Sequence, residues 1–250
     1  MARVEFRVLA VPERADHVRD ILGRLHMSED IVFWDREHNG CMWNALRLWK
    51  SYRDLPEGAT HLCLIADDAL IVNQFVEAST KCAQRFPDAI WSFATYDAHA
   101  NQRGANSPYV ELWNCNLRGL CYMMPVWLVQ GYIDFYEKYL SQKKKWERDD
   151  VTCKMYALTH GIRVMMPVPN LAIAKRIPSV IKGHWKQNRI EDCWQGEDID
   201  LQQFDTFNYS VTRGRALFDT HLKENEPAFI VTERAYRNKL ALDRKQRGIP

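Results

Sequence analysis

The sequence lacks several features that would place the protein in a specialised class. Its seven cysteines are scattered and none belongs to a Cys-x-x-Cys pair, which argues against a disulfide framework and against a thiolate zinc site. No apolar run approaches the roughly 20 residues of a membrane-spanning helix. Internal repeats and low-complexity tracts are also missing. These absences favour an ordinary globular domain.

An excess of charge of one sign is missing as well. The formal net charge is only +2 over 250 residues, so the total charge calls for neither a nucleic acid nor a membrane surface. The first residues become charged after a short apolar stretch, unlike a secretory signal peptide, and we expect a reducing, cytoplasmic location. Hydrophobic residues make up 46% of the chain and aromatic residues 12%, which is enough for a sizeable core.

The order of apolar patterns in the first hundred residues predicts an α/β fold. Strand patterns occupy residues 4–11, 30–35, 61–66 and 89–96. Helical patterns lie between them, at residues 12–25, 39–52 and 73–86. Strands that alternate with helices of this length predict a mostly parallel sheet flanked by helices.

The remainder of the chain is less regular. Residues 97–114 are rich in Asn and Gly and are expected to form a loop, partly mobile. The further predicted elements are a helix from about residue 125, a helix at 148–161 that ends at Gly161, and a strand at 162–170. We expect one domain over residues 1–190 and a C-terminal helical extension over 191–250, with a basic helix near its end, packed on that domain.

Chemically distinctive residues follow three of the predicted strands. In an open sheet of this kind, ligands bind beyond the carboxyl ends of the strands. Adjacent carboxylates at such an end suit Mg²⁺ or Mn²⁺ that also binds substrate phosphates. One aspartate that caps the next helix beside a solvated neighbour explains the pair equally well. The residues at these strand ends are Val11, Pro12 and Arg14, then Asp35, then Asp67 and Asp68.

The segment "THLCLIADDALIVNQF" resembles the acidic, DxD-type segment of GT-A-fold nucleotide-sugar glycosyltransferases, including small bacteriophage and bacterial enzymes. The order of parts agrees over about residues 4–190, and "RDDVTCKMYALTHGIRVMMPVPN" resembles the start of the acceptor half of that family. This chain has Ala66 before its two aspartates, where the pattern would place an acidic residue. The resemblance implies a GT-A-like, Rossmann-like sheet and sugar transfer from a nucleotide donor, with a UDP-sugar foremost.

The resemblance also implies roles for single residues. Asp68 would be the principal ligand of Mn²⁺ or Mg²⁺, with Asp67 as a second ligand or a ribose contact. His184 is a further candidate metal ligand, although the position where we first expect that histidine holds Ala174. An exposed loop histidine, a helix-start arginine and a turn aspartate are the ordinary explanations of such residues. The implied donor-binding residues are Val11, Pro12, Arg14, Asp35 and Asp67.

Asp149 and Asp150 open the helix at 148–161 and are the candidate catalytic residues. In an inverting transfer, one of them would deprotonate the acceptor hydroxyl, whereas a retaining transfer needs no such base. Acidic residues are also common in the first turn of a helix because they complement its dipole. Residues 149–154 loosely resemble a two-metal nuclease motif too, but their helical pattern argues against that alternative.

Residues 175–189 hold five Lys or Arg, no acidic residue and an interleaved tryptophan. Such a stretch suits a polyanion, a leaving diphosphate or an anionic membrane surface. By analogy with bacteriophage enzymes, the preferred acceptor is a hydroxymethylated pyrimidine in DNA; lipopolysaccharide or another glycan is the alternative, and a non-catalytic DNA-binding protein is the non-enzyme alternative. The candidate acceptor or diphosphate ligands are Lys175, Arg176, Lys182, Trp185 and Lys186. The sugar, the stereochemistry and the oligomeric state stay open.

Overall fold

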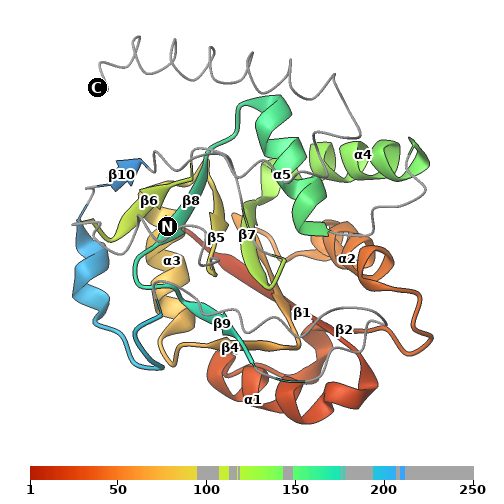
Figure 1. Ribbon diagram of the computed structural model, residues 1–250, viewed down its shortest axis with the longest axis horizontal. Helices are drawn as coiled ribbons and strands as arrows, with labels where there is room; N and C mark the ends of the chain where they lie inside the picture. The colour runs from red at the N-terminus through yellow and green to blue at the C-terminus, as the bar shows by residue number, and fades with distance from the viewer. Residues whose placement is uncertain are drawn as a thin grey trace.

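The computed structural model describes residues 1–94, 107–112, 117, 119–142, 149–175, 177, 194–206 and 209–211. Its central sheet has eight strands in the order β10-β6-β8-β5-β7-β3-β1-β2 (Figure 1). The strands are β1 (Val4–Ala10), β2 (Val32–Trp34), β3 (His61–Ala66), β5 (Ile90–Ser92), β6 (Tyr109–Glu111), β7 (Cys121–Pro125), β8 (Val164–Pro167) and β10 (Tyr209–Val211). The predicted α/β class with a mostly parallel, Rossmann-like sheet is confirmed.

Five helices pack on this sheet. They are α1 (Ala15–Leu25), α2 (Cys41–Lys50), α3 (Phe75–Arg85), α4 (Val126–Gln142) and α5 (Asp149–His160). Gly161 follows α5 with a φ of 65°, a left-handed conformation in which glycine is favoured, as its predicted role at the helix end requires. Among the helices that the structure describes, none is long and apolar enough to cross a membrane.

The direction of the strands determines where a ligand site can form. β2, β1 and β3 are mutually parallel, and β5 is parallel to β8. β7 is antiparallel to both β3 and β5, so β3 and β5 point the same way. The five strands β1, β2, β3, β5 and β8 are therefore all parallel, and β7 runs against them. Their carboxyl ends therefore meet at one edge of the sheet, which is the edge where ligands of open α/β sheets bind.

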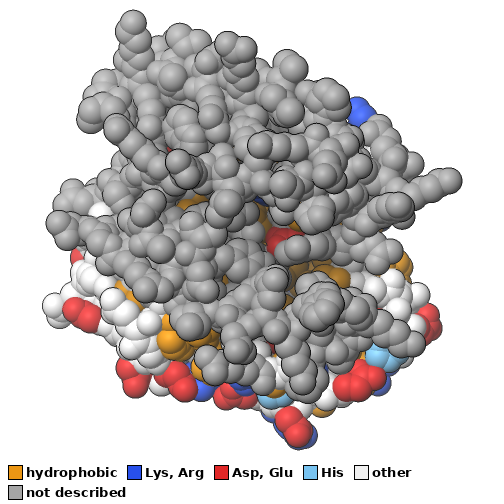
Figure 2. Space-filling model, in the orientation of Figure 1, with side chains coloured by type: hydrophobic (Ala, Val, Ile, Leu, Met, Phe, Trp, Pro, Cys, Tyr) orange, Lys and Arg blue, Asp and Glu red, His pale blue; other side chains and the backbone are white. Residues whose placement is uncertain are grey.

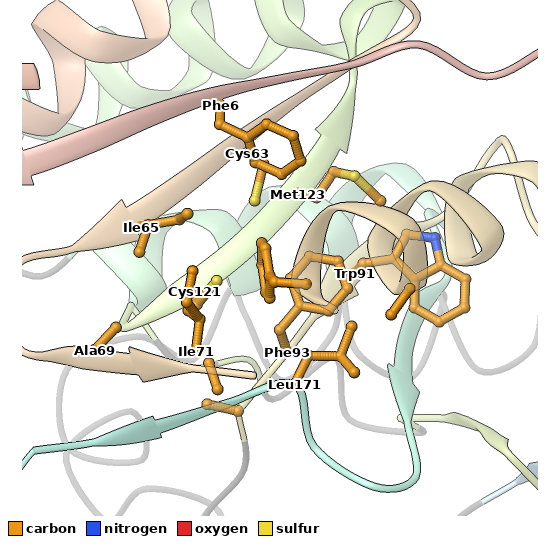
Figure 3. Packing of buried hydrophobic residues seen from close by; sticks show 14 of the residues in the cluster. Phe6, Cys63, Ile65, Ala69, Ile71, Trp91, Phe93, Cys121, Met123 and Leu171 are labelled. Atoms are coloured by element: carbon orange, nitrogen blue, oxygen red, sulfur yellow. The ribbon is translucent and has the colours of Figure 1, made fainter. Parts of the chain in front are cut away.

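Alternating residues of each strand serve two separate cores, one on either face. On β3, Leu62 and Leu64 face α2, α4 and α5, which Figure 1 shows grouped on one side. Cys63 and Ile65 point to the other face and pack with residues of α1 and α3. Figure 3 shows part of this second core, where Trp91 and Phe93 stack. Apolar helix faces on both sides explain why the central strands are almost continuously hydrophobic.

One predicted loop contains a strand. Residues 97–114 were expected to lack regular structure, but β6 pairs antiparallel with β8, with Tyr109 opposite Pro167. Tyr109 is fully buried, and its hydroxyl donates a hydrogen bond to the carbonyl of Phe204 at 2.6 Å. Packing against residues distant in sequence thus overrides a local composition typical of loops. Residues 95–106 and 113–116 lie outside the described part of the chain.

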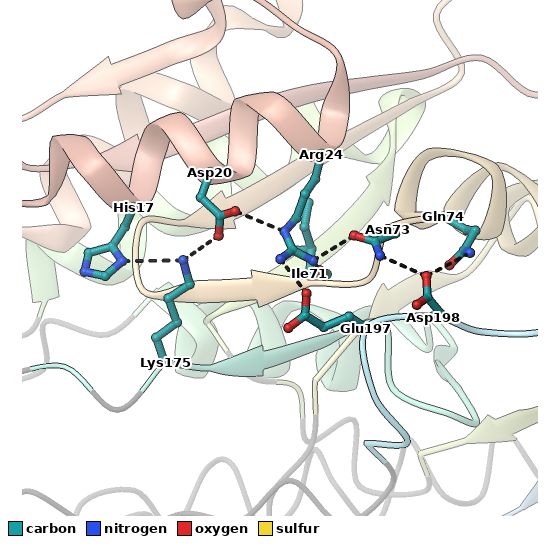
Figure 4. Close-up of polar contacts among 9 residues, drawn as sticks. All are labelled: His17, Asp20, Arg24, Ile71, Asn73, Gln74, Lys175, Glu197 and Asp198. Atoms are coloured by element: carbon teal, nitrogen blue, oxygen red, sulfur yellow. Dashed lines mark hydrogen bonds and ion pairs between the residues drawn. The ribbon is translucent and has the colours of Figure 1, made fainter.

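A small second sheet and a polar network fasten part of the C-terminal region to the domain. β4 (Ala69–Ile71) pairs antiparallel with β9 (Ala172–Ala174). Arg24 of α1 donates to the carbonyl of Ile71 and to the carboxylate of Glu197, as Figure 4 shows. The described residues 194–206 also contact α3, for example through Arg85 and Asp205. The predicted basic helix of the extension lies outside the described residues.

His61, the first residue of β3, is buried with an exposed fraction of 1%. Burial disfavours the imidazolium and lowers the pKa of His61 from its ordinary 6.5 to about 4. Between these two values the unfolded chain binds a proton that the folded chain does not bind. As the pH falls through this window, the free energy of unfolding is expected to decrease by about 3 kcal/mol on account of His61.

A His61→Phe variant tests this prediction, because phenylalanine keeps a ring but has no titrating group. Wild type and variant are compared by urea unfolding at pH 7.5 and pH 4.5. The wild type is expected to lose more stability between these pH values than the variant does. An equal loss in the two proteins would show that His61 is not the residue that couples folding to pH here.

Candidate functional site

The segments that follow β1, β2 and β3 lie side by side at one edge of the sheet. The backbone N–H of Asp67 donates to the carbonyl of Leu9 at 2.9 Å, and that of Asp35 donates to the carbonyl of Ala10 at 2.8 Å. Both bonds continue the parallel pairing of the strands past their ends. The residues that follow the three strands, including Val11, Asp35 and Asp67, therefore lie at the same edge of the sheet.

Asp67 is paired with Arg14. Its Oδ1 accepts a hydrogen bond from Nη1 of Arg14 at 2.5 Å, and its Oδ2 accepts one from the backbone N–H of Val11 at 2.9 Å. Both side chains are buried, with residue exposures of 6% for Asp67 and 9% for Arg14. Burial raises the pKa of Asp67, and the charge of Arg14 and the Val11 N–H oppose that rise. Arg14 is thus the positive partner that a buried carboxylate requires.

Asp68 is the more accessible member of the pair. Its side chain is 36% exposed, and its Oδ2 lies 3.7 Å from Nη1 of Arg14. Within the part of the chain that the structure describes, no three His, Cys, Asp or Glu side chains are grouped so as to hold a metal ion. Asp68 offers one partly exposed carboxylate, and Mg²⁺ can bind through a single carboxylate when substrate phosphates and water supply its other ligands. Asp67 fits less well, because both of its oxygens already accept hydrogen bonds.

Asp35 shapes the entry to α2. Its two carboxylate oxygens accept hydrogen bonds from the backbone N–H groups of Asn39 and Gly40, each at 2.9 Å. Gly40 adopts a φ of 105°, which side-chain-bearing residues rarely adopt. The structure thus shows Asp35 in the ordinary role of a turn aspartate. Its predicted contact with a donor stays a prediction.

Asp149 is held by tyrosines in the interior. Its carboxylate accepts hydrogen bonds from the hydroxyl of Tyr122 on β7 and from that of Tyr132 on α4, the latter at 2.8 Å. The Tyr122 hydroxyl accepts in turn from Nε1 of Trp49 at 3.2 Å. Burial raises the pKa of Asp149 to about 6, against the lowering effect of these hydroxyls. With an exposure of 3% and both oxygens occupied, Asp149 anchors the start of α5.

Asp150 lies next to this anchor, at an exposure of 7%. Its Oδ1 accepts from the backbone N–H of Val151 at 2.9 Å. Gly119, just before β7, packs against it so closely that an added Cβ would lie 3.3 Å from the Cβ of Asp150. Glycine therefore leaves room for the Asp150 side chain. Residues 149–154 are helical, so the adjacent strand positions that a two-metal nuclease would use are not formed here.

Cys41, the first residue of α2, lies within the electrostatic influence of both acidic pairs. The pKa of Cys41 is raised to about 12, first by burial and then by the negative charges of Asp149, Asp150, Asp68 and Asp67. By accessible surface, Cys41 is an exposed residue at the start of α2. Asp67, Asp68, Asp149 and Asp150, here called the acidic cluster, thus act on one point although they come from distant segments.

Several residues of this region carry no recognisable signal in the sequence. A lone cysteine such as Cys41 has no pattern that singles it out, and the tyrosines around Asp149 read as ordinary core residues. Lys175 is described, and its ammonium pairs with Asp20 on α1 at 2.7 Å (Figure 4). The other basic-stretch candidates and the candidate metal ligand lie outside the described residues: Arg176, Lys182, His184, Trp185 and Lys186.

A hollow of about 460 Å³ lies beside α1 and is lined by Asp20, Gly23, Arg24, His26 and Asn73. Figure 2 shows charged side chains of both signs along the edge where Figure 1 places α1. Arg24 bonds to Asp20 and Asn73 within the wall itself. Because the charge of Arg24 is paired with Asp20 and Glu197, this hollow is a less suitable site for a charged ligand than the edge at Asp68.

Comparison with models of known protein families gave no match, and neither did a search of curated proteins. A functional argument therefore depends on the geometry of this chain. The part that the structure describes brings together Arg14, Asp67 and Asp68 from the donor prediction. Asp149 and Asp150 from the catalytic prediction are buried together at the start of α5.

Proposed function

We propose that the protein is a metal-dependent glycosyltransferase that moves a sugar from a nucleotide-sugar donor to a hydroxyl acceptor. The observation that carries this proposal is the pairing of Arg14 with Asp67 and Asp68 at the edge of the sheet where the parallel strands β1, β2 and β3 end. A donor site and a catalytic carboxylate must be neighbours in such an enzyme. In this proposal Asp68 would serve the donor and Asp150 the acceptor.

The first pair suits the donor. Departure of a nucleoside diphosphate builds negative charge, and Mn²⁺ or Mg²⁺ bound to Asp68 would stabilise that charge as a Lewis acid. Arg14 adds a fixed positive charge from the turn after β1. Asp67 holds Arg14 in place and shares it with Asp68. The residues described at this edge therefore meet the electrostatic needs of the leaving group.

The second pair suits the acceptor. Asp150 would take the proton from the acceptor hydroxyl as the hydroxyl oxygen attacks the sugar. Asp149 is unsuited to that role, because tyrosine hydroxyls occupy both of its oxygens. It instead fixes the start of α5 and with it the backbone of Asp150. This assignment applies to an inverting reaction.

The acceptor we prefer is a hydroxymethylated pyrimidine in DNA, with action in the cytoplasm, or in the host cytoplasm for a phage-encoded enzyme. The basic, tryptophan-containing stretch at 175–189 supports a polyanionic acceptor. Transfer of radiolabelled sugar to hydroxymethylated DNA, with unmodified DNA and lipopolysaccharide as the comparison acceptors, tests this choice. Label in lipopolysaccharide alone would favour the glycan alternative.

The donor site is tested by thermal unfolding with UDP, GDP, CDP or ADP, each with and without Mn²⁺. Binding to the folded state adds about 2.7 kcal/mol to the free energy of unfolding at a ligand concentration 100 times the Kd, and this raises the temperature midpoint of unfolding. We expect a clear rise with one nucleotide, UDP foremost, and only when the metal is present. Asp68→Ala is expected to abolish the rise. No shift with any pair at millimolar concentration would contradict the proposal.

A further inference from the structure

Arg14 occupies an unusual position for an arginine. Its exposure is 9%, and a single nitrogen, Nη1, contacts both aspartates at the end of β3. The contact with Asp67 is short, at 2.5 Å, whereas that with Asp68 is long, at 3.7 Å. Arg14 is therefore firmly attached to one carboxylate and weakly attached to the other.

The surrounding charge explains why a cation is needed there. Arg14 Nη1 lies 2.5 Å from Asp67 and 3.7 Å from Asp68, so its positive charge meets two adjacent carboxylates. Carboxylates this close repel one another unless a positive charge lies between them. The turn at Pro12–Arg14, directly after β1, delivers that charge from the neighbouring strand.

We propose that Arg14 is the resident counter-ion of the Asp67–Asp68 pair and competes with a divalent cation for Asp68. This inference rests on the proposed function, because it takes Asp68 as the metal ligand. The donor set fits: Asp68 offers a partly exposed carboxylate, and the guanidinium beside it stands in for a cation. Asp67 keeps Arg14 attached while Asp68 exchanges one positive partner for another.

The exchange has a consequence for the donor. An arginine that Asp67 still holds remains next to the phosphates of a donor bound at Asp68, where its planar fork of N–H groups suits phosphate oxygens. Arg14 thus lowers the affinity of Asp68 for a metal ion that arrives without phosphates. It favours the metal when phosphates arrive with it, because the phosphates then satisfy the displaced charge.

The test measures the affinity for Mn²⁺ in the absence of nucleotide, from the electron paramagnetic resonance signal of the free ion. Wild type is compared with Arg14→Gln and Arg14→Lys. Glutamine keeps a donor for Asp67 but removes the charge, and lysine keeps the charge. Loss of a positive charge a few ångströms from the ion is expected to tighten Mn²⁺ binding about tenfold in Arg14→Gln. Arg14→Lys is expected to stay within about threefold of wild type, since the repulsion remains. Arg14→Met, which also removes the charge, repeats the test if the glutamine variant does not fold.

The outcomes separate the two proposals. Equal or weaker Mn²⁺ binding in the uncharged variants than in wild type overturns the counter-ion role, and the metal site stands if Asp68→Asn abolishes the binding. If Asp68→Asn binds Mn²⁺ as wild type does, the proposed metal site itself is wrong and the counter-ion role fails with it. If no variant binds Mn²⁺ alone, removal of the Arg14 charge does not release the site and the counter-ion role fails, while the thermal assay with nucleotide and Mn²⁺ decides the proposed function.

Discussion

Replacing Asp150 by asparagine is expected to slow sugar transfer by about 10²- to 10⁴-fold, the usual contribution of a general base. Asparagine has nearly the same shape, so nucleotide binding in the thermal assay should be unchanged. The loss should appear in the turnover number rather than in the donor affinity, because the base acts only as the hydroxyl attacks. Initial rates at saturating donor provide the measurement.

Asp149→Asn is the matched control, since it removes the neighbouring carboxylate from the same helical turn. Its amide oxygen still accepts from one tyrosine hydroxyl and its NH₂ donates to the other. We expect a rate within about tenfold of wild type, because Asp149 acts through position only. If Asp150→Asn is as active as wild type, the base role is wrong and a retaining reaction becomes the better explanation. A large loss in Asp149→Asn alone would reverse the two assignments.

The sequence was a good guide to elements whose pattern is local. The strand at 61–66 appears as predicted, with the same bounds, because a buried strand between two turn signals leaves little choice. The helix that begins at Asp149 was also predicted, from its apolar face and its terminal glycine. Both predictions depend on neighbours within one turn of the chain or along one strand.

What the sequence could not provide is the pairing of side chains across the fold. Nothing in the turn at residues 12–14 indicates that Arg14 turns toward Asp67, some 53 positions away. The capture of Asp149 by Tyr122 and Tyr132 likewise requires three separate elements to be in place. The adjacent aspartates at 67–68 and at 149–150 read alike in sequence. Burial separates the first pair, since Asp67 is buried and the side chain of Asp68 is 36% exposed. Both members of the second pair are buried, and the tyrosine partners of Asp149 are the basis for assigning it to structure.

The second large effect is on stability. Asp67→Ala is expected to lower the free energy of unfolding by about 3–5 kcal/mol, because it leaves the buried guanidinium of Arg14 without its closest partner. It also removes the acceptor for the backbone N–H of Val11. Urea unfolding at pH 7.5 gives the change directly. Asp68→Ala is the matched control and should cost less than about 1 kcal/mol, since exposed ion pairs contribute little.

A double-mutant cycle shows whether the pair itself is the cause. Replacing Arg14 by Met together with Asp67 by Leu removes both charges, and buried pairs exchanged for apolar residues often cost little. The double variant is therefore expected to be more stable than either single variant, Asp67→Leu or Arg14→Met, despite carrying one more substitution. Additive losses would mean that the two residues stabilise the fold independently. Asp67 would then not be the residue that holds Arg14 in place. The assignment of Asp67 to structure and of Asp68 to metal binding would lose its physical basis.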